Sequence, residues 1–183
     1  MLRMIQKSWY WKKPLRQISK RLRSLKTADP QEIVKDDDRF AQIERDIFIG
    51  FYSVRKLFDT VTTVTDDTKA LQFIISWYPN VMPVTLMNNH RIEKLYNLAT
   101  PQQETRSARF ISNVIIHSFI FMPYVEESGL AGILFTSDTD RNKKLYTMKI
   151  DDVITLFERV GNDDPAEVHW SLEPTGKEIT KVS

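Results

Sequence analysis

Positively charged side chains concentrate at the start of this chain. The first 26 residues contain nine Lys or Arg and no acid, whereas the remaining residues contain 17 basic and 24 acidic side chains, so the net charge of +2 hides a strong separation. Clustered cations can bind phosphates or carboxylates, because the local field of a surface decides which partners it attracts. The candidate residues for binding an anion or a partner are Lys7, Lys12, Lys13, Arg16, Lys20, Arg21 and Arg23, with the aromatic residues Trp9 and Trp11.

Three kinds of anionic partner fit this basic segment. In a nucleic acid, the cations would neutralise phosphates and the aromatic rings would stack on unpaired bases. On an anionic membrane, Trp9 and Trp11 would lie at the level of the lipid headgroups. An acidic protein is the third kind. In a competing interpretation, the segment docks on the acidic remainder of its own chain and its lysines are merely solvated.

A second group of polar residues has helical spacing. Arg106, Arg109, Asn113 and His117 lie at offsets of 0, 3, 7 and 11, and on a helix that begins after Pro101 they share one flank. Two guanidinium groups in such a row could bind a carboxylate or a phosphate, with His117 as an acid or a base. The competing interpretation is an exposed helix face that ends in a histidine favoured by the helix dipole.

Several classes of chemistry lack their sequence signals. The five glycines form no phosphate-binding loop, which excludes a P-loop and a dinucleotide fingerprint. The chain has no cysteine, and none of its three histidines is followed by another four residues later. Residues 137–142 fit an Asx-rich turn better than a calcium loop. We therefore expect neither a metal nor a cofactor, and no catalytic residue is identified.

The sequence also predicts where the protein resides. No stretch reaches the roughly 18 continuous apolar residues of a membrane span. Lys7, Lys12 and Lys13 interrupt any apolar region of a secretory signal. The expected compartment is the cytoplasm, or an organelle if residues 1–26 act as a presequence.

Periodicity predicts the elements that position these residues. From Pro14, the residues Leu15, Ile18, Leu22 and Leu25 form one narrow apolar stripe of a helix. A buried central helix is expected over 38–60, with Gly50 allowing the close approach of a neighbouring element. Further helices are expected over 101–117, which Thr100 would cap, and over 151–160, which Gly161 would end. Strands are expected over 71–78, 119–126, 130–136 and 145–150, with Pro123 placing its strand at a sheet edge.

These elements predict an α+β fold, in which a small and mainly antiparallel sheet of about four strands packs against two longer helices and a short one. The expected organisation is a basic amphipathic arm over 1–30, a globular domain over 31–161 and a polar C-terminal tail over 162–183. We expect a non-enzymatic binding or adaptor protein whose arm contacts an anionic partner. One alternative is a small enzyme or ligand-binding domain that uses the residues from Arg106 to His117. The other is a structural protein, a homo-oligomer assembled through its N-terminal helix.

Overall fold

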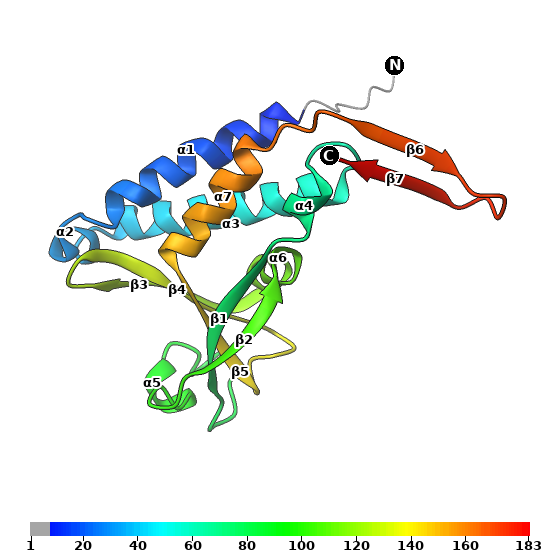
Figure 1. The fold of residues 1–183 in the computed structure, drawn as a ribbon. Coiled ribbons are helices and arrows are strands. Elements are labelled where there is room, and N and C mark those ends of the chain that lie inside the picture. Colours follow the sequence, from blue (N-terminus) through cyan, green and yellow to red (C-terminus); the bar gives the residue numbers. More distant parts are fainter. Residues whose placement is uncertain (1–7) are drawn as a thin grey trace, which may run out of the picture.

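The computed structural model describes residues 8–183, so Lys7 lies outside the described residues. The fold is α+β, as the sequence predicts, and its five-stranded antiparallel sheet has the order β2-β1-β5-β4-β3 (Figure 1). The strands are β1 (Gln72–Pro79), β2 (Gln102–Ser107), β3 (Ser118–Glu126), β4 (Gly129–Ser137) and β5 (Lys144–Lys149). The expected strands are β1, β3, β4 and β5, and β3, which carries Pro123, lies at an edge as predicted.

The first helix, α1 (Trp9–Leu25), packs against both α3 (Asp37–Asp59) and α7 (Ile150–Asn162) (Figure 1). Its apolar stripe is part of the main core, because Leu15, Ile18 and Leu22 are at most 2% exposed. The helix begins at Trp9 rather than at Pro14, which lies inside it. Pro14 indicated a helix start, but the helix also includes the residues before it, and there Trp11 packs on Tyr52 of α3.

Two glycines allow helices to approach closely. A Cβ atom on Gly50 of α3 would lie 2.3 Å from the ring of Phe157 on α7, which explains the glycine as predicted. Gly161 does not end α7, contrary to the prediction, since the helix continues to Asn162. A Cβ at Gly161 would lie 3.0 Å from Cγ of Arg16, so this glycine makes room for α1.

The segment after Pro101 differs most from the prediction. It forms the edge strand β2 and then the shorter helix α6 (Ala108–Ile116), instead of one helix over 101–117. Ser107 caps α6, because its Oγ accepts a hydrogen bond from the backbone N–H of Phe110 at 3.2 Å. Antiparallel pairing of β2 with β1, from Gln72 opposite Ser107 to Trp77 opposite Gln102, overrides the local helix signal.

The sheet has apolar packing on both faces. Phe73, Ile75 and Trp77 occupy alternate positions of β1, so they share one face and pack against the main core. On the other face, Tyr78 packs against a smaller cluster, which contains Val84, Ile92, Leu95, Tyr96, Ile120 and Leu145. The loops of the fold also contain three short helices, α2 (Pro30–Val34), α4 (Asp66–Lys69) and α5 (Ile92–Leu95).

The C-terminal region forms a hairpin that the sequence did not predict. Strands β6 (Val168–Leu172) and β7 (Glu178–Val182) make a separate two-stranded sheet, which projects away from the body of the protein (Figure 1). The side chains of β6 are all exposed. Apolar and polar residues do alternate along β6, but the run covers only five residues and polar residues surround it, so the segment was predicted as a polar tail.

Candidate interaction face on α1 and α3

Many cations of α1 bind groups of the same chain. Nε and Nη2 of Arg21 donate to the two carboxylate oxygens of Asp46 on α3, at 2.7 and 2.8 Å. On the opposite flank, Arg23 pairs with Glu158 of α7 at 2.7 Å, and Lys26 pairs with Asp151. These three side chains therefore fix α1 in place, and the competing interpretation of the basic segment holds for this part of it.

Lys12 and Arg16 hold the end of α7. The Lys12 side chain donates from Nζ to the carbonyl oxygen of Asp163 at 2.6 Å, and Arg16 donates to the carbonyl of Gly161. Burial lowers the pKa of Lys12, and the nearby charges of Asp163 and Asp164 partly offset this effect. Neither cation is presented to an external partner, because both serve as hydrogen-bond donors to the backbone at the C-terminal end of a helix.

The solvent-facing side of α1 retains free cations. Lys13 and Lys20 are exposed, and neither forms an ion pair with any group in residues 8–183. The Nζ atom of Lys13 lies 5.2 Å from the centre of the Trp9 ring. Trp9 and Tyr10 are themselves 47% and 56% exposed, so aromatic surface and positive charge lie together at this end of the helix.

The central helix adds a matching stripe. Arg45, Ile49, Tyr52 and Lys56 are all exposed, and their spacings of four, three and four residues place them along one side of α3. The two helices run antiparallel, because Trp11 contacts Tyr52 with ring centres 5.8 Å apart while Arg21 pairs with Asp46. The exposed side of α1 and this stripe of α3 therefore form one continuous surface.

We call this surface the α1–α3 face. Its members are Trp9, Tyr10, Lys13, Gln17 and Lys20 of α1, and Arg45, Ile49, Tyr52 and Lys56 of α3. Within the described part of the chain, its four cations have no ion-pair partner. Asp46 lies beneath Arg21 with a side chain 6% exposed, and Glu44 lies about 100° round the helix axis from Arg45. The face can thus offer cations and aromatic rings to an anion.

The sequence indicated half of this face. Lys13, Lys20, Trp9 and Trp11 were candidates because of the basic segment, and the structure places them at or beside the surface, with Trp11 half-buried. The residues of α3 were not identified. A signal was available, since positions 45, 49, 52 and 56 have helical spacing and place two cations and a tyrosine along one side of the helix.

The other candidate group divides between two elements. Arg106 lies on β2, where Nε donates to Glu104 at 2.7 Å and the guanidinium stacks 4.5 Å from the Phe110 ring. Lys144 of β5 also binds Glu104, at 2.5 Å. Burial raises the pKa of the neighbouring Tyr146 to about 12. The pKa of Glu104 is lowered, because hydrogen bonds from Arg106 and Lys144 outweigh the opposing effect of burial.

The remaining three members of that group lie on α6 or at its end. Arg109 binds Asp59 and the carbonyl oxygen of Phe58, both on α3. The Oδ1 atom of Asn113 is buried without a hydrogen-bond partner, and His117 is exposed at the C-cap of α6. Arg106 and Arg109 are thus engaged with different elements. The predicted shared flank is wrong because Arg106 is not on the helix.

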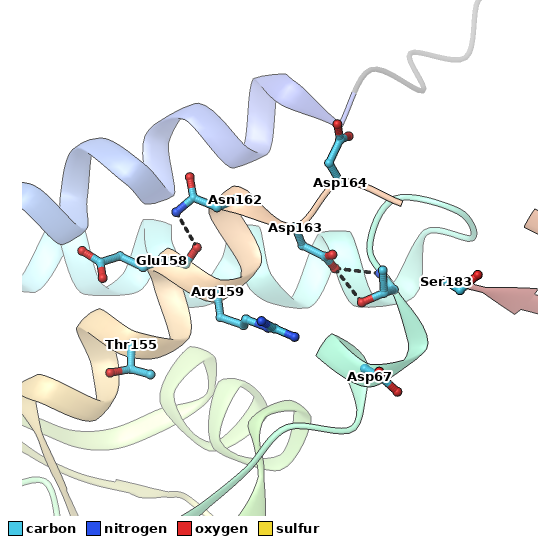
Figure 2. Close-up of a pocket in the computed structure, with 9 residues that line it drawn as sticks. Asp67, Thr155, Glu158, Arg159, Asn162, Asp163, Asp164 and Ser183 are labelled. Atoms are coloured by element: carbon cyan, nitrogen blue, oxygen red, sulfur yellow. Dashed lines mark hydrogen bonds between the residues drawn. The ribbon is translucent and has the colours of Figure 1, made fainter. Parts of the chain in front are cut away.

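A hollow of about 600 Å³ lies between α7, α4 and the end of β7 (Figure 2). Asp163 and Thr65 both line this hollow, and Oδ2 of Asp163 accepts hydrogen bonds from the backbone N–H and the hydroxyl of Thr65 at 2.7 and 3.1 Å. The lining consists of Thr65, Asp67, Thr155, Glu158, Arg159, Asn162, Asp163, Asp164 and Ser183. One arginine among four carboxylates does not favour an anion. Across residues 8–183, no three His, Asp or Glu side chains are grouped to hold a metal ion.

No helix in the described range is long and apolar enough to cross a bilayer. Comparison of the chain with protein-family models, with curated proteins and with solved structures gives no match.

Proposed function

We propose that this chain is a non-enzymatic binding or adaptor protein, and that its α1–α3 face contacts an anionic partner. The observation that supports the proposal is the division of the basic segment into two sets. Arg21, Arg23 and Lys26 bind acids of the same chain, whereas Lys13 and Lys20 remain exposed without an ion-pair partner in the described residues.

The physical chemistry of the face supports an anion as its partner. Lys13, Lys20, Arg45 and Lys56 lie along two adjacent helices, so several can reach one extended array of phosphates or carboxylates at once. Each neutralised phosphate releases counterions, which makes such binding favourable and dependent on salt. Tyr10, Tyr52 and Trp9, each about half exposed, add flat surfaces that stack on bases or lie among lipid headgroups.

Rigidity favours the same role. The buried side of α1 lies in the core, and its flanks are tied to α3 through Asp46 and to α7 through Glu158. The exposed cations are therefore held on a fixed backbone, and less conformational entropy is lost when a partner binds. An alternative role for Arg106, Arg109, Asn113 and His117 in a pocket lacks such support, because the two arginines bind groups on different elements.

The test replaces three cations of the face by neutral residues. We expect a Lys13→Gln, Lys20→Gln and Lys56→Gln variant to bind heparin, single-stranded DNA or phosphatidylserine vesicles roughly a hundredfold more weakly than the wild type does. The estimate uses about 1 kcal/mol for each lysine at an anionic surface. Affinity would be measured at several salt concentrations, and the variant should show a shallower salt dependence.

A matched variant controls for net charge. Arg91→Gln, Lys94→Gln and Lys149→Gln also remove three exposed cations, from positions outside the α1–α3 face. This variant should bind each probe within about twofold of the wild type. The proposal fails if the wild type binds none of the three anionic probes, or if both variants lose affinity equally.

A further inference from the structure

The C-terminal hairpin presents an apolar stripe to solvent. Val168, Trp170 and Leu172 alternate along β6 and therefore point to the same face. They are 48%, 60% and 57% exposed, and opposite them on β7 lie Val182, Thr180 and Glu178. The body of the protein does not cover this stripe, because the hairpin projects away from it (Figure 1).

The hairpin has a regular turn at its tip and contacts the body of the protein at its base. The ladder ends in a turn in which Gly176 N–H donates to the carbonyl of Glu173 and Gly176 has a φ of 81°. At the base, Val182 is 3% exposed and its N–H donates to Asp66 at 3.0 Å. A two-stranded hairpin without further packing is marginally stable in water. Additional packing on β6 would therefore stabilise it.

The outer edge of β6 has backbone groups available for another strand. The N–H of Glu173 donates to the carbonyl oxygen of Lys177, and the N–H of Ser183 donates to that of Glu167. The odd-numbered residues of β6 and its flanks therefore form the backbone hydrogen bonds to β7. In an antiparallel ladder, the even-numbered residues then direct their N–H and C=O groups to the outer edge. These are the residues of the apolar stripe, and an open edge of this kind is a template for pairing.

We propose that β6 pairs with β6 of a second copy of this chain, antiparallel and about a two-fold axis at Ser171. The outward backbone groups of Trp170 would then bond with those of Leu172 of the second copy, and Leu172 with Trp170 of the second copy. The two apolar stripes would form one continuous surface across a four-stranded sheet. Such an interface is isologous, because each copy contributes the same strand and the assembly closes as a dimer.

The side chains opposite each other favour this register over its neighbour. With the axis at Ser171, His169 lies opposite Glu173 of the second copy, twice in each dimer, where the imidazole can hydrogen-bond the carboxylate as it does with Glu167 of its own chain at 3.2 Å. Moving the axis to Trp170 would place Glu167 opposite Glu173 of the second copy, and like charges that face each other are destabilising. The pairing uses no residue of the α1–α3 face, so it stands or falls independently of the proposed function.

A cysteine at the axis tests the pairing directly. Residues at the axis form a non-hydrogen-bonded pair, whose side chains approach closely enough for a disulfide. The chain contains no cysteine, so any cross-link reports the introduced residue. Under mild oxidation, we expect full-length Ser171→Cys to form a covalent dimer that non-reducing electrophoresis detects. Ser128→Cys, at an exposed position in the β3–β4 loop, should form no covalent dimer at the same concentration.

Light scattering provides the second measurement. The wild type should have the mass of a dimer, and Trp170→Glu should have the mass of a monomer, because two carboxylates would then face the shared apolar surface. Ile179→Glu makes a matched change on β7, at a side chain 42% exposed on the other face, and should remain dimeric. The proposal is overturned by a monomeric wild type, by assemblies larger than a dimer, or by equal cross-linking of Ser171→Cys and Ser128→Cys.

Discussion

Arg21 is engaged within the fold by an ion pair with the buried side chain of Asp46. Because its side chain is 6% exposed, an unpaired Asp46 carboxylate would be costly, and both of its oxygens accept hydrogen bonds from the guanidinium. These bonds raise the pKa of Arg21 and hold the side chain along the flank of α1. Lys20, one residue earlier, is exposed and unpaired within the described residues. Of two adjacent cations, one is thus engaged within the fold, and the other is exposed and belongs to the face proposed to bind a partner.

Substitution should separate these roles. We expect Arg21→Met to lower the free energy of unfolding by about 2 kcal/mol, because it leaves a buried carboxylate without donors. Lys20→Met should change the same quantity by less than about 0.5 kcal/mol, as is usual for exposed positions. Urea denaturation of both variants gives the comparison. Equal losses of stability would contradict the assignment of Arg21 to the fold.

The spacing of the basic segment could not have revealed this division. Arg21, Arg23 and Lys26 bind acids that are 25, 135 and 125 residues away in the sequence. Which cation has an acid opposite it depends on where α3 and α7 lie against α1, and local sequence does not encode that arrangement. The apolar stripe of Leu15, Ile18 and Leu22 was readable, because burial of one helix face follows from its period.

At the scale of elements, β2 and α6 show how pairing outweighs a local signal. Thr100 and Pro101 resemble a helix start, yet both are exposed, and strand β2 begins at Gln102. The register with β1 extends over the whole of β2, which gives this polar segment a set of backbone hydrogen bonds. The helix starts only where the strand ends, at Ser107, which supplies the N-cap.

Capping substitutions test this boundary. We expect Ser107→Ala to lower the free energy of unfolding by about 1 kcal/mol, because the N–H of Phe110 loses its acceptor. Thr100→Ala should change it by less than about 0.5 kcal/mol, since Thr100 caps no helix in the structure. Thermal or urea unfolding measures both. A larger effect at Thr100 than at Ser107 would show that the helix begins where the sequence signal placed it.

The elements that the sequence predicted well share one property. The helix α3, the strands β1, β3, β4 and β5, and the helix α7 all bury apolar residues with a clear period. The strand β2 and the hairpin β6–β7 bury little, so their existence depends on partners along a ladder. The polar strand β2 has no apolar period, and the alternation in β6 covers only five residues, which explains why these strands were missed while the class of the fold was correct.

On the scale of the whole molecule, α1 links the two proposed surfaces. Its exposed side supplies half of the α1–α3 face, and its start binds the C-terminal end of α7 through Lys12 and Asp163. The chain passes from there directly into the hairpin (Figure 1). A dimer formed through β6 would hold two α1–α3 faces in one particle. A long anionic partner could then engage both, and its apparent affinity would exceed that of a single face.

The central place of α1 also predicts the result of truncation. Deletion of residues 1–26 removes Leu15, Ile18 and Leu22, three fully or almost fully buried side chains, and uncovers the apolar sides of α3 and α7. A single Leu22→Ala change should already cost about 2–5 kcal/mol, a large share of the stability of an ordinary domain. We therefore expect the truncated protein to lose its cooperative thermal transition. Truncation after Asp164 is the matched control, because it removes the projecting hairpin and should preserve that transition. If the chain without residues 1–26 still unfolds cooperatively, α1 is an accessory to the fold, and the rigidity of the α1–α3 face has no basis.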